Sequence, residues 1–336
     1  MNKKQFLWFL LAAAVFVAAG FAGVNSALSA REQAASLAEQ AAEYAGLFGG
    51  GAAADKGFDF PQSAYMARVD VSGTIADAGT GVSLSGGGGY DHQAVLDYVD
   101  ALSEDENNLG ILLFIDSPGG EIKAGDELYL KLMDYKKATG RPIYCYFDGT
   151  ACSGGYYVAM ASDEICADRN CICVNIGVYI STYNFSGLYE KLGVEQIAFK
   201  SSENKGIGMS GLPWTEEQKE IYQSIVDLYY DQFLEIVAQG RHMTKDQVRA
   251  LDDGREMLAA QALEAGFIDS IGRWQDYKED VLSRMGTDIL YEYTPREDML
   301  QGFLKYFSSA LPRSDTQALL DFAQGHDRFV VMAYGG

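Results

Sequence analysis

Short β-rich runs alternate with amphipathic helical stretches over much of the chain, and this alternation constrains the fold more than any other feature. Repeated strand and helix units are typical of an α/β domain with a largely parallel sheet. The expected strands are Ala67–Ile75, Ile111–Ile115, Pro142–Phe147, Glu164–Ala167 and Ile176–Ile180. The expected helices are Asp91–Leu102, Ala124–Lys137, Gly154–Ala161 and Phe185–Leu192.

The longest expected helix begins at Thr215. Thr215 to Gln218 reads Thr-Glu-Glu-Gln, a capping box whose first and last side chains bind free amides of the first turn. Apolar residues then recur at helical spacing, and the helix is expected to end near Gly240. These apolar residues are Ile221, Ile225, Leu228, Tyr229, Phe233 and Val237.

The amino terminus carries an uncharged apolar run from Phe6 to Val24, preceded by Lys3 and Lys4. A helix needs about 20 such residues to cross a bilayer, whereas the apolar region of a cleaved signal peptide has about 7 to 15. The best cleavage site, ending at Ala30, has Leu28 where a small residue is preferred, so a retained membrane anchor is favoured over a cleaved signal. Basic residues stay on the cytoplasmic side, so the bulk of the chain is expected to be extracytoplasmic.

The chain has 336 residues, of which 48% are apolar, enough for a sizeable core. It carries 47 acidic and 26 basic residues, which gives a formal net charge of −21. Lys3 and Lys4 precede the apolar run and no acidic residue does, so the part after the run is more acidic still. Such a surface repels phosphate backbones, and no nucleic-acid partner is expected.

Five cysteines lie within one short stretch, at Cys145, Cys152, Cys166, Cys171 and Cys173. The odd count rules out a fully paired set within one chain, although Cys166 and Cys171 could bridge a turn in an oxidising compartment. Their spacing does not match a zinc site, so buried free thiols in a core are the favoured interpretation.

The first motif with chemical potential is Asp116-Ser117-Pro118-Gly119-Gly120, which follows an apolar strand and precedes a helix. Its two glycines allow a backbone amide to point into a cleft. Amides fixed in this way form an oxyanion hole, where negative charge develops on a carbonyl oxygen. Taken alone, the motif is explained equally well by an ordinary strand-to-helix turn.

The second motif is Cys152-Ser153-Gly154-Gly155-Tyr156-Tyr157, which places Ser153 at the start of a small apolar helix. A serine there is activated by the positive end of the helix, and the Gly154 amide beside it is a second oxyanion donor. The alternative is that Ser153 simply caps the helix. The two motifs in this order are more informative than either one.

A catalytic serine needs a base, and histidine is the usual one. The chain has only His92, His242 and His326, and none lies between Ser153 and Gly240. Lysine is the remaining candidate, and it must be neutral, which requires burial. Lys200 and Lys205 both follow the second motif, and their residue types alone select neither.

Taken together, these motifs resemble the signal peptide peptidase A family of serine-lysine peptidases, which have the ClpP/crotonase fold. The resemblance covers about Ala67 to Gly272. Besides the two motifs, it rests on Asn175-Ile176-Gly177-Val178, the loop with Lys205, Tyr230 to Phe233, Gly240-Arg241, Asp253-Gly254-Arg255, Ala262, Gly266 and Ile268-Asp269.

The resemblance implies a Ser-Lys dyad, with Ser153 as nucleophile and Lys205 as general base. It also implies that the amides of Gly120 and Gly154 form the oxyanion hole. The chain departs from the family at Val174-Asn175, where a Gly-Ser is usual. It departs again near the lysine, where Ser202 and Asn204 replace a glycine and an aromatic residue, so Lys200 stays open as the alternative base.

The implied substrates are remnant signal peptides and other unfolded apolar peptides near the membrane. The implied assembly is a homo-oligomer whose neighbouring copies can supply serine and lysine to one site. No cofactor and no metal ion is expected. Two alternatives remain: a non-catalytic membrane scaffold of the same fold, and an acyl-CoA enzyme, against which the anchor and the Ser153 motif argue.

With this resemblance the chain divides into four parts. These are a cytoplasmic tip and transmembrane anchor (1–30), a helix and Gly/Ala-rich linker (31–62), a peptidase domain (63–283) and a C-terminal extension (284–336). The apolar end of the extension, Phe329 to Tyr334, could lie in a substrate groove as an added strand. An ordinary packed or disordered end is the favoured interpretation.

Overall fold

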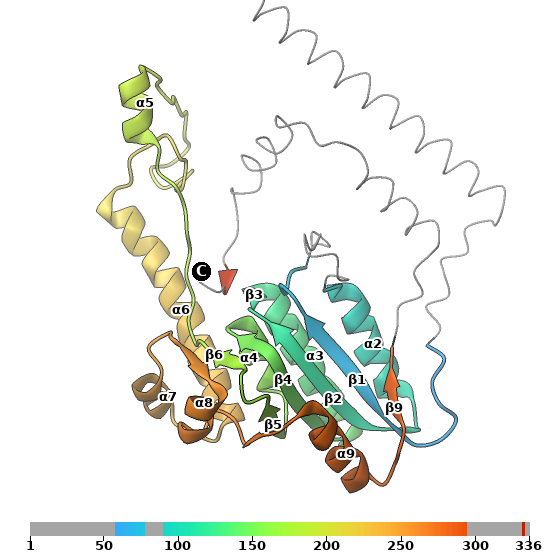
Figure 1. Ribbon diagram of the computed structural model, residues 1–336. Coiled ribbons are helices and arrows are strands. Elements are labelled where there is room, and N and C mark those ends of the chain that lie inside the picture. Colours follow the sequence, from blue (N-terminus) through green and yellow to red (C-terminus); the bar gives the residue numbers. More distant parts are fainter. Residues whose placement is uncertain (1–57, 78–89, 294–330, 333–336) are drawn as a thin grey trace, which may run out of the picture. The chain divides into compact units, whose positions relative to one another are not determined.

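The computed structural model describes residues 58–77, 90–293 and 331–332 (Figure 1). The expected anchor Phe6–Val24 and the glycine-rich stretches 49–54 and 79–89 lie outside these residues. In the part of the chain that the structure describes, no helix is both long and apolar enough to span a bilayer.

An eight-stranded sheet forms the centre of the described chain (Figure 1), which confirms the expected α/β class. Its main path runs β7-β6-β4-β2-β1-β9, and β5 and β8 extend it from β4. All pairings are parallel except that of β7 with β6. The strands are β1 (Tyr65–Ser72), β2 (Asn108–Ser117), β4 (Ile143–Cys152), β5 (Glu164–Ala167), β6 (Ile172–Val174), β7 (Glu256–Leu258), β8 (Ser270–Ile271) and β9 (Leu290–Glu292).

Helices cover both faces of the sheet, because alternate side chains of each strand point to opposite sides. Leu113 and Cys145 belong to the larger core, which also includes residues of α2, α3, α4 and α6. Their neighbours Leu112 and Tyr146 pack with Val281 of α9 in a second core. The helices are α2 (His92–Glu104), α3 (Ile122–Thr139), α4 (Gly154–Ala159), α5 (Ser186–Leu192), α6 (Glu216–Gly240), α7 (Lys245–Leu251), α8 (Ala259–Glu264) and α9 (Trp274–Met285).

Strand β4 is shared between two partners. Its first half pairs with β5 through Tyr144 to Phe147, and its second half pairs with β6 through Thr150 to Cys152. On the other side, Ala151 lies opposite Ser117 at the end of β2. The carboxyl ends of β2, β4 and β6 therefore meet, and the two glycine-containing motifs leave the sheet at the same edge.

The expected strand Ile176–Ile180 is wrong. The structure has its strand earlier, at β6, and the chain leaves the sheet after Val174. Val174 and Asn175 have positive φ angles of 76° and 56°, which cannot continue an extended strand. Ile176 is buried all the same, so its apolar character reflects the core and not a sheet.

The other strands and helices that the sequence predicted within the described residues are confirmed, with shifted ends. In α6 the capping box is present, with Thr215 Oγ1 accepting from Gln218 N at 3.2 Å. The buried apolar side chains of α6 lie in its second half and include Phe233, Leu234 and Val237, whereas Leu228 is 72% exposed. The first half of α6 therefore keeps the apolar pattern of the second half, although its apolar side chains lie outside the buried core of one chain.

The segment between β6 and α6 forms a projection that we call the arm (residues 177–214). Figure 1 shows it, with α5, extending along α6 away from the sheet. No arm residue is buried, and Phe199 is 99% exposed. Other exposed apolar side chains of the arm are Tyr179, Tyr183, Phe185, Leu188, Leu192, Val194, Ile197 and Met209.

A second, two-stranded sheet lies beside the first motif. Strand β3 (Gly120–Glu121) pairs antiparallel with β10 (Val331–Met332). The apolar tail thus contributes an added strand at these two residues, where the sequence favoured an ordinary end.

Candidate active site

Ser153 stands between β4 and α4 in a strained conformation, with φ 50° and ψ −116°. A positive φ is uncommon for residues other than glycine and is found where surrounding contacts impose it. Here the Ser153 amide donates to the carbonyl of Val174 at 2.8 Å. The side chain forms no capping hydrogen bond, so the interpretation of Ser153 as a simple helix cap is wrong.

The Ser153 hydroxyl is buried without a partner. The residue is 0% exposed, and Oγ has no hydrogen bond to any described residue. Buried polar groups almost always have a partner, and each exception needs an explanation, of which a catalytic role is one. This orphan hydroxyl is the strongest single indication of a functional site in the described chain.

The two predicted oxyanion glycines come together beside Ser153. A Cβ built on Gly154 would lie 3.2 Å from the Gly120 amide nitrogen and 3.4 Å from the Gly119 Cα. Gly120 itself pairs with Ile75, and a Cβ there would meet the Ile75 carbonyl oxygen at 1.9 Å. Gly120 therefore requires glycine, and a side chain at Gly154 would have to displace the backbone of Gly120 by a few tenths of an ångström.

Ser117 and Asp116 hold the first motif in place. The Ser117 hydroxyl donates to the Gly73 carbonyl at 2.6 Å and accepts from the Gly119 amide at 3.1 Å. Asp116 Oδ1 accepts from the Thr150 amide at 2.9 Å, which joins this turn to β4. Sequence reasoning assigned no role to these two side chains, although both lie within the motif it selected.

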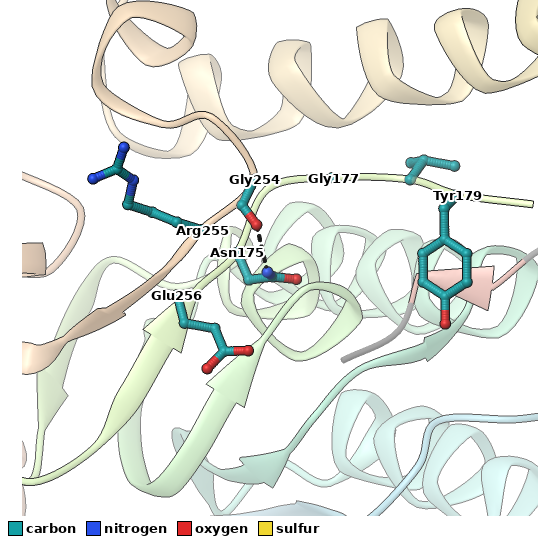
Figure 2. Close-up of a pocket in the computed structure, with 7 residues that line it drawn as sticks. Asn175, Gly177, Tyr179, Gly254, Arg255 and Glu256 are labelled. Carbon is teal, nitrogen blue, oxygen red and sulfur yellow. Dashed lines mark hydrogen bonds between the residues drawn. The ribbon is translucent and has the colours of Figure 1, made fainter. Parts of the chain in front are cut away.

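The turn after β6 is braced by the loop after α7 (Figure 2). Asn175 Nδ2 donates to the Gly254 carbonyl at 2.7 Å, and the Ile176 amide donates to Asp252 Oδ2 at 2.9 Å. Burial raises the pKa of Asp252 to about 7. Sequence reasoning missed Asp252, because an aspartate at a helix end gives no sign of burial.

A pocket of about 370 Å³ opens beside this turn (Figure 2). Its lining combines the turn, the first residues of the arm and the loop before β7. The residues are Asn175, Gly177, Val178, Tyr179, Gly254, Arg255 and Glu256. Tyr156 and Tyr157 do not line it, because both are buried in the core, where the Tyr156 hydroxyl donates to the Phe267 carbonyl at 2.7 Å.

Within one chain the structure does not bring the predicted lysines to Ser153. Lys205 is exposed on the arm, and Lys200, also exposed, donates from Nζ to the Glu203 carbonyl at 3.0 Å. His92 is not a substitute, because its ring contacts the Tyr90 hydroxyl and the Glu127 carboxylate. Among described residues, no base contacts the Ser153 hydroxyl.

The five cysteines are free and buried, which confirms the favoured interpretation, and the Cys166–Cys171 bridge is not formed. Burial raises the pKa of the Cys152 thiol to about 12, so this neighbour of Ser153 is no competing nucleophile at neutral pH. No group of His, Cys, Asp and Glu side chains in the described ranges is arranged to hold a metal ion.

Two family models match the chain. That of peptidase family S49 matches residues 135–286, and that of Clp protease matches residues 90–171, which include Ser153. A solved ClpP1 mutant from Listeria monocytogenes aligns with a TM-score of 0.40 and 16% identity, covering 62% of this chain and 92% of that one.

Three relatives are similar in sequence. "Putative signal peptide peptidase SppA" of Enterococcus faecium is 38% identical, covering 66% of this chain and 62% of that protein. A "Putative protease" of Synechocystis is 32% identical, covering 66% and 75%. "Serine protease SPPA, chloroplastic" of Arabidopsis thaliana is 27% identical, covering 54% and 26%. The chain thus spans less than two thirds of the Enterococcus protein's length.

The largely parallel sheet makes the described chain an α/β protein, and its residues 90–171 match the Clp protease model. Within that class, the chain belongs to peptidase family S49. The resemblance that the motifs indicated is confirmed at the level of the family.

Proposed function

We propose that this protein is a membrane-anchored serine endopeptidase that cleaves remnant signal peptides and other unfolded apolar peptides with a Ser153–Lys205 dyad. The observation that carries the proposal is Ser153 itself, a strained and buried serine whose hydroxyl has no partner among the described residues and which lies beside the glycines of two converging motifs. The membership of peptidase family S49 and the names of the relatives support the reaction class.

The proposed reaction has two halves. The neutral Lys205 amine takes the Ser153 proton, and Oγ attacks the peptide carbonyl, whose oxygen becomes an anion that accepts from the Gly120 and Gly154 amides. The carbon–nitrogen bond then breaks, and the leaving amine takes the proton from the lysine. Water next attacks the acyl ester with Lys205 as base, which releases the new carboxylate and restores the serine hydroxyl.

Lys205 needs a drier environment than one chain gives it. A lysine is neutral at ordinary pH only where burial lowers its pKa, and Lys205 is exposed on the arm. We propose that a neighbouring copy covers the arm and that Lys205 of one copy serves Ser153 of the next. The exposed apolar side chains of the arm and of the first half of α6 support such an interface.

The proposed substrate lies as an extended strand along β3. A peptide bound there would place a carbonyl beside Gly120, and main-chain hydrogen bonds to a strand edge suit unfolded segments of varied sequence. The pairing of β10 with β3 supports this, since an apolar segment already adopts that pose. The uncharged run Phe6–Val24 would keep the enzyme at the membrane with its catalytic domain outside the cytoplasm, in line with the proposed four-part division.

The test is hydrolysis of an apolar fluorogenic peptide by the purified full chain in detergent. Ser153→Ala and Lys205→Ala should each lower kcat by at least about 10³-fold, and Lys200→Ala should stay active. A dead Lys200→Ala variant beside an active Lys205→Ala would move the base to Lys200. An assembled wild-type protein that cleaves nothing would favour a non-catalytic scaffold.

A further inference from the structure

The turn that positions Ser153 is itself strained. Val174, whose carbonyl accepts the Ser153 amide at 2.8 Å, has a φ of 76°, and Asn175 follows with a φ of 56°. Asparagine tolerates this region, but a β-branched valine is an outlier there and costs about 1 to 3 kcal/mol. Such a turn keeps its shape only where neighbouring contacts hold it.

Two hydrogen bonds from one loop supply that restraint, and Figure 2 shows the one between Asn175 and Gly254. The Gly254 carbonyl accepts from Asn175 Nδ2 at 2.7 Å, and Asp252 Oδ2 accepts from the Ile176 amide at 2.9 Å. Asp252 is only 2% exposed, and its other oxygen, Oδ1, has no hydrogen bond among the described residues. The carboxyl therefore holds the Ile176 amide and also interacts with the backbone of Gly254 in its own loop.

We propose that Asp252 is a positioning residue for Ser153 and that its ionisation makes the reactivity of Ser153 depend on pH. It acts through the chain Asp252, Ile176 amide, Val174 carbonyl and Ser153 amide, and it does not touch the substrate. The proposal rests on the proposed role of Ser153 as nucleophile.

The direction of the effect follows from hydrogen-bond strength. An ionised carboxylate accepts a shorter and stronger hydrogen bond than a neutral carboxyl group, so the turn is held more firmly when Asp252 is charged. Burial raises the pKa of Asp252 to about 7, which places the change near neutral pH. The titratable and charged groups that act on Asp252 are Asp253 and Arg255 on its loop, Tyr230 of α6 and Tyr156 of α4, with Arg249 of α7 beside Tyr230.

The experiment measures how fast a small fluorophosphonate labels Ser153 in the assembled full chain between pH 5 and 9, with the labelled residue identified by mass spectrometry. Wild type should show a rise in rate centred near pH 7, besides any rise from the general base. Asp252→Asn keeps an oxygen acceptor but no charge, so it should lose this rise and react about tenfold more slowly at high pH.

Asp253→Asn is the second variant, and it leaves Asp252 in place. The negative charge of Asp253 raises the pKa of Asp252, so its removal should move the same rise to lower pH without changing the rate on the high-pH plateau. This variant keeps the proposal testable if Asp252→Asn does not fold.

An unchanged pH profile in Asp252→Asn or in Asp253→Asn would overturn the inference and leave the proposed function standing. Labelling of Ser153→Ala at the wild-type rate would instead remove Ser153 as nucleophile, and the proposed function would fail first. The two failures are therefore distinguishable in one series of measurements.

Discussion

Ser153 has three properties that a surface or capping serine lacks. Its φ is positive, its hydroxyl is buried without a partner among the described residues, and the glycines of two motifs lie beside it. Strain and an unsatisfied polar group both cost stability, and Ser153 is the described residue that combines a positive φ with a buried side-chain atom lacking a partner. At the scale of single residues, backbone strain and an unpartnered hydroxyl distinguish Ser153 from an ordinary core serine.

Alanine substitution of Gly154 and of Gly140 distinguishes an effect on catalysis from an effect on stability. Gly154→Ala places a methyl group 3.2 Å from the Gly120 nitrogen and should lower kcat about 10²-fold, because the oxyanion donors shift. Gly140→Ala is the control, since Gly140 has open space around its Cβ position, and its positive φ of 69° strains only the local backbone. It should lose about 1 kcal/mol of stability and keep its kcat, as measured by peptide hydrolysis and thermal unfolding.

Asp252 predicts how stability depends on pH. Its pKa rises from 3.8 to about 7 on folding, so between about pH 4 and pH 7 the native state keeps a proton that the unfolded chain has lost. Its contribution to stability is therefore greatest below pH 4 and falls by about 1.4 kcal/mol per pH unit up to pH 7.

Asp252→Asn removes this titration. Relative to the variant, wild type should become less stable between pH 5 and pH 7.5 in calorimetric unfolding of the full chain. A difference in unfolding midpoint that stays constant over this range would contradict the raised pKa.

At the scale of elements, the spacing of apolar residues predicted the strands and helices that are buried within one chain. The strands around Ile111–Ile115 and Glu164–Ala167 were found where expected, because their apolar runs lie in the core. The strand expected at Ile176–Ile180 was false, because the positive φ angles of Val174 and Asn175 end the sheet before it, and the burial of Ile176 comes from the core. The Ser153 motif, Gly120 and Gly154 were also predictable from local sequence, because their residue types are typical of tight turns.

The contacts of Asp252 and Ser117 were not predictable in this way. Asp252 meets Ile176 from 76 residues away, and Ser117 meets Gly73 from 44 residues away. No local pattern encodes these pairs, which depend on how β6, β7 and β2 are ordered in the sheet. Local sequence patterns therefore indicate the proposed nucleophile Ser153 but not the residues that hold its surroundings.

The attachment of α4 to the core is testable through two tyrosines. The Tyr156 hydroxyl donates to the Phe267 carbonyl at 2.7 Å in a fully buried site, so Tyr156→Phe leaves that carbonyl unsatisfied and should cost about 1 to 3 kcal/mol. Tyr98→Phe is the matched control, since the buried Tyr98 hydroxyl has no partner among the described residues. It should cost nothing or stabilise the protein; equal losses in both variants would contradict the assigned hydrogen bond.

At the scale of the whole molecule, the arm and α6 expose more apolar surface than a single chain needs. Monomeric proteins seldom expose large contiguous apolar patches, and such patches mark interaction sites. Leu228 of α6 and Phe199 of the arm are 72% and 99% exposed. The neighbouring copy proposed above would cover this surface and would also bring a base to Ser153, whose hydroxyl contacts none within the described part of one chain.

Complementation between two inactive variants tests this arrangement. Ser153→Ala supplies an intact Lys205, and Lys205→Ala supplies an intact Ser153, so a mixed assembly restores complete sites wherever the two variants meet in the right order. Random co-assembly of equal amounts should restore about a quarter of the wild-type activity, because each site draws its serine and its lysine independently from neighbouring copies. The measurement is peptide hydrolysis by co-expressed, differently tagged chains purified through both tags, with each variant alone as control. Mixed assemblies that form but stay inactive would place both residues of each site in one chain, and the arm would then have to fold back over Ser153 to bring Lys205 to it.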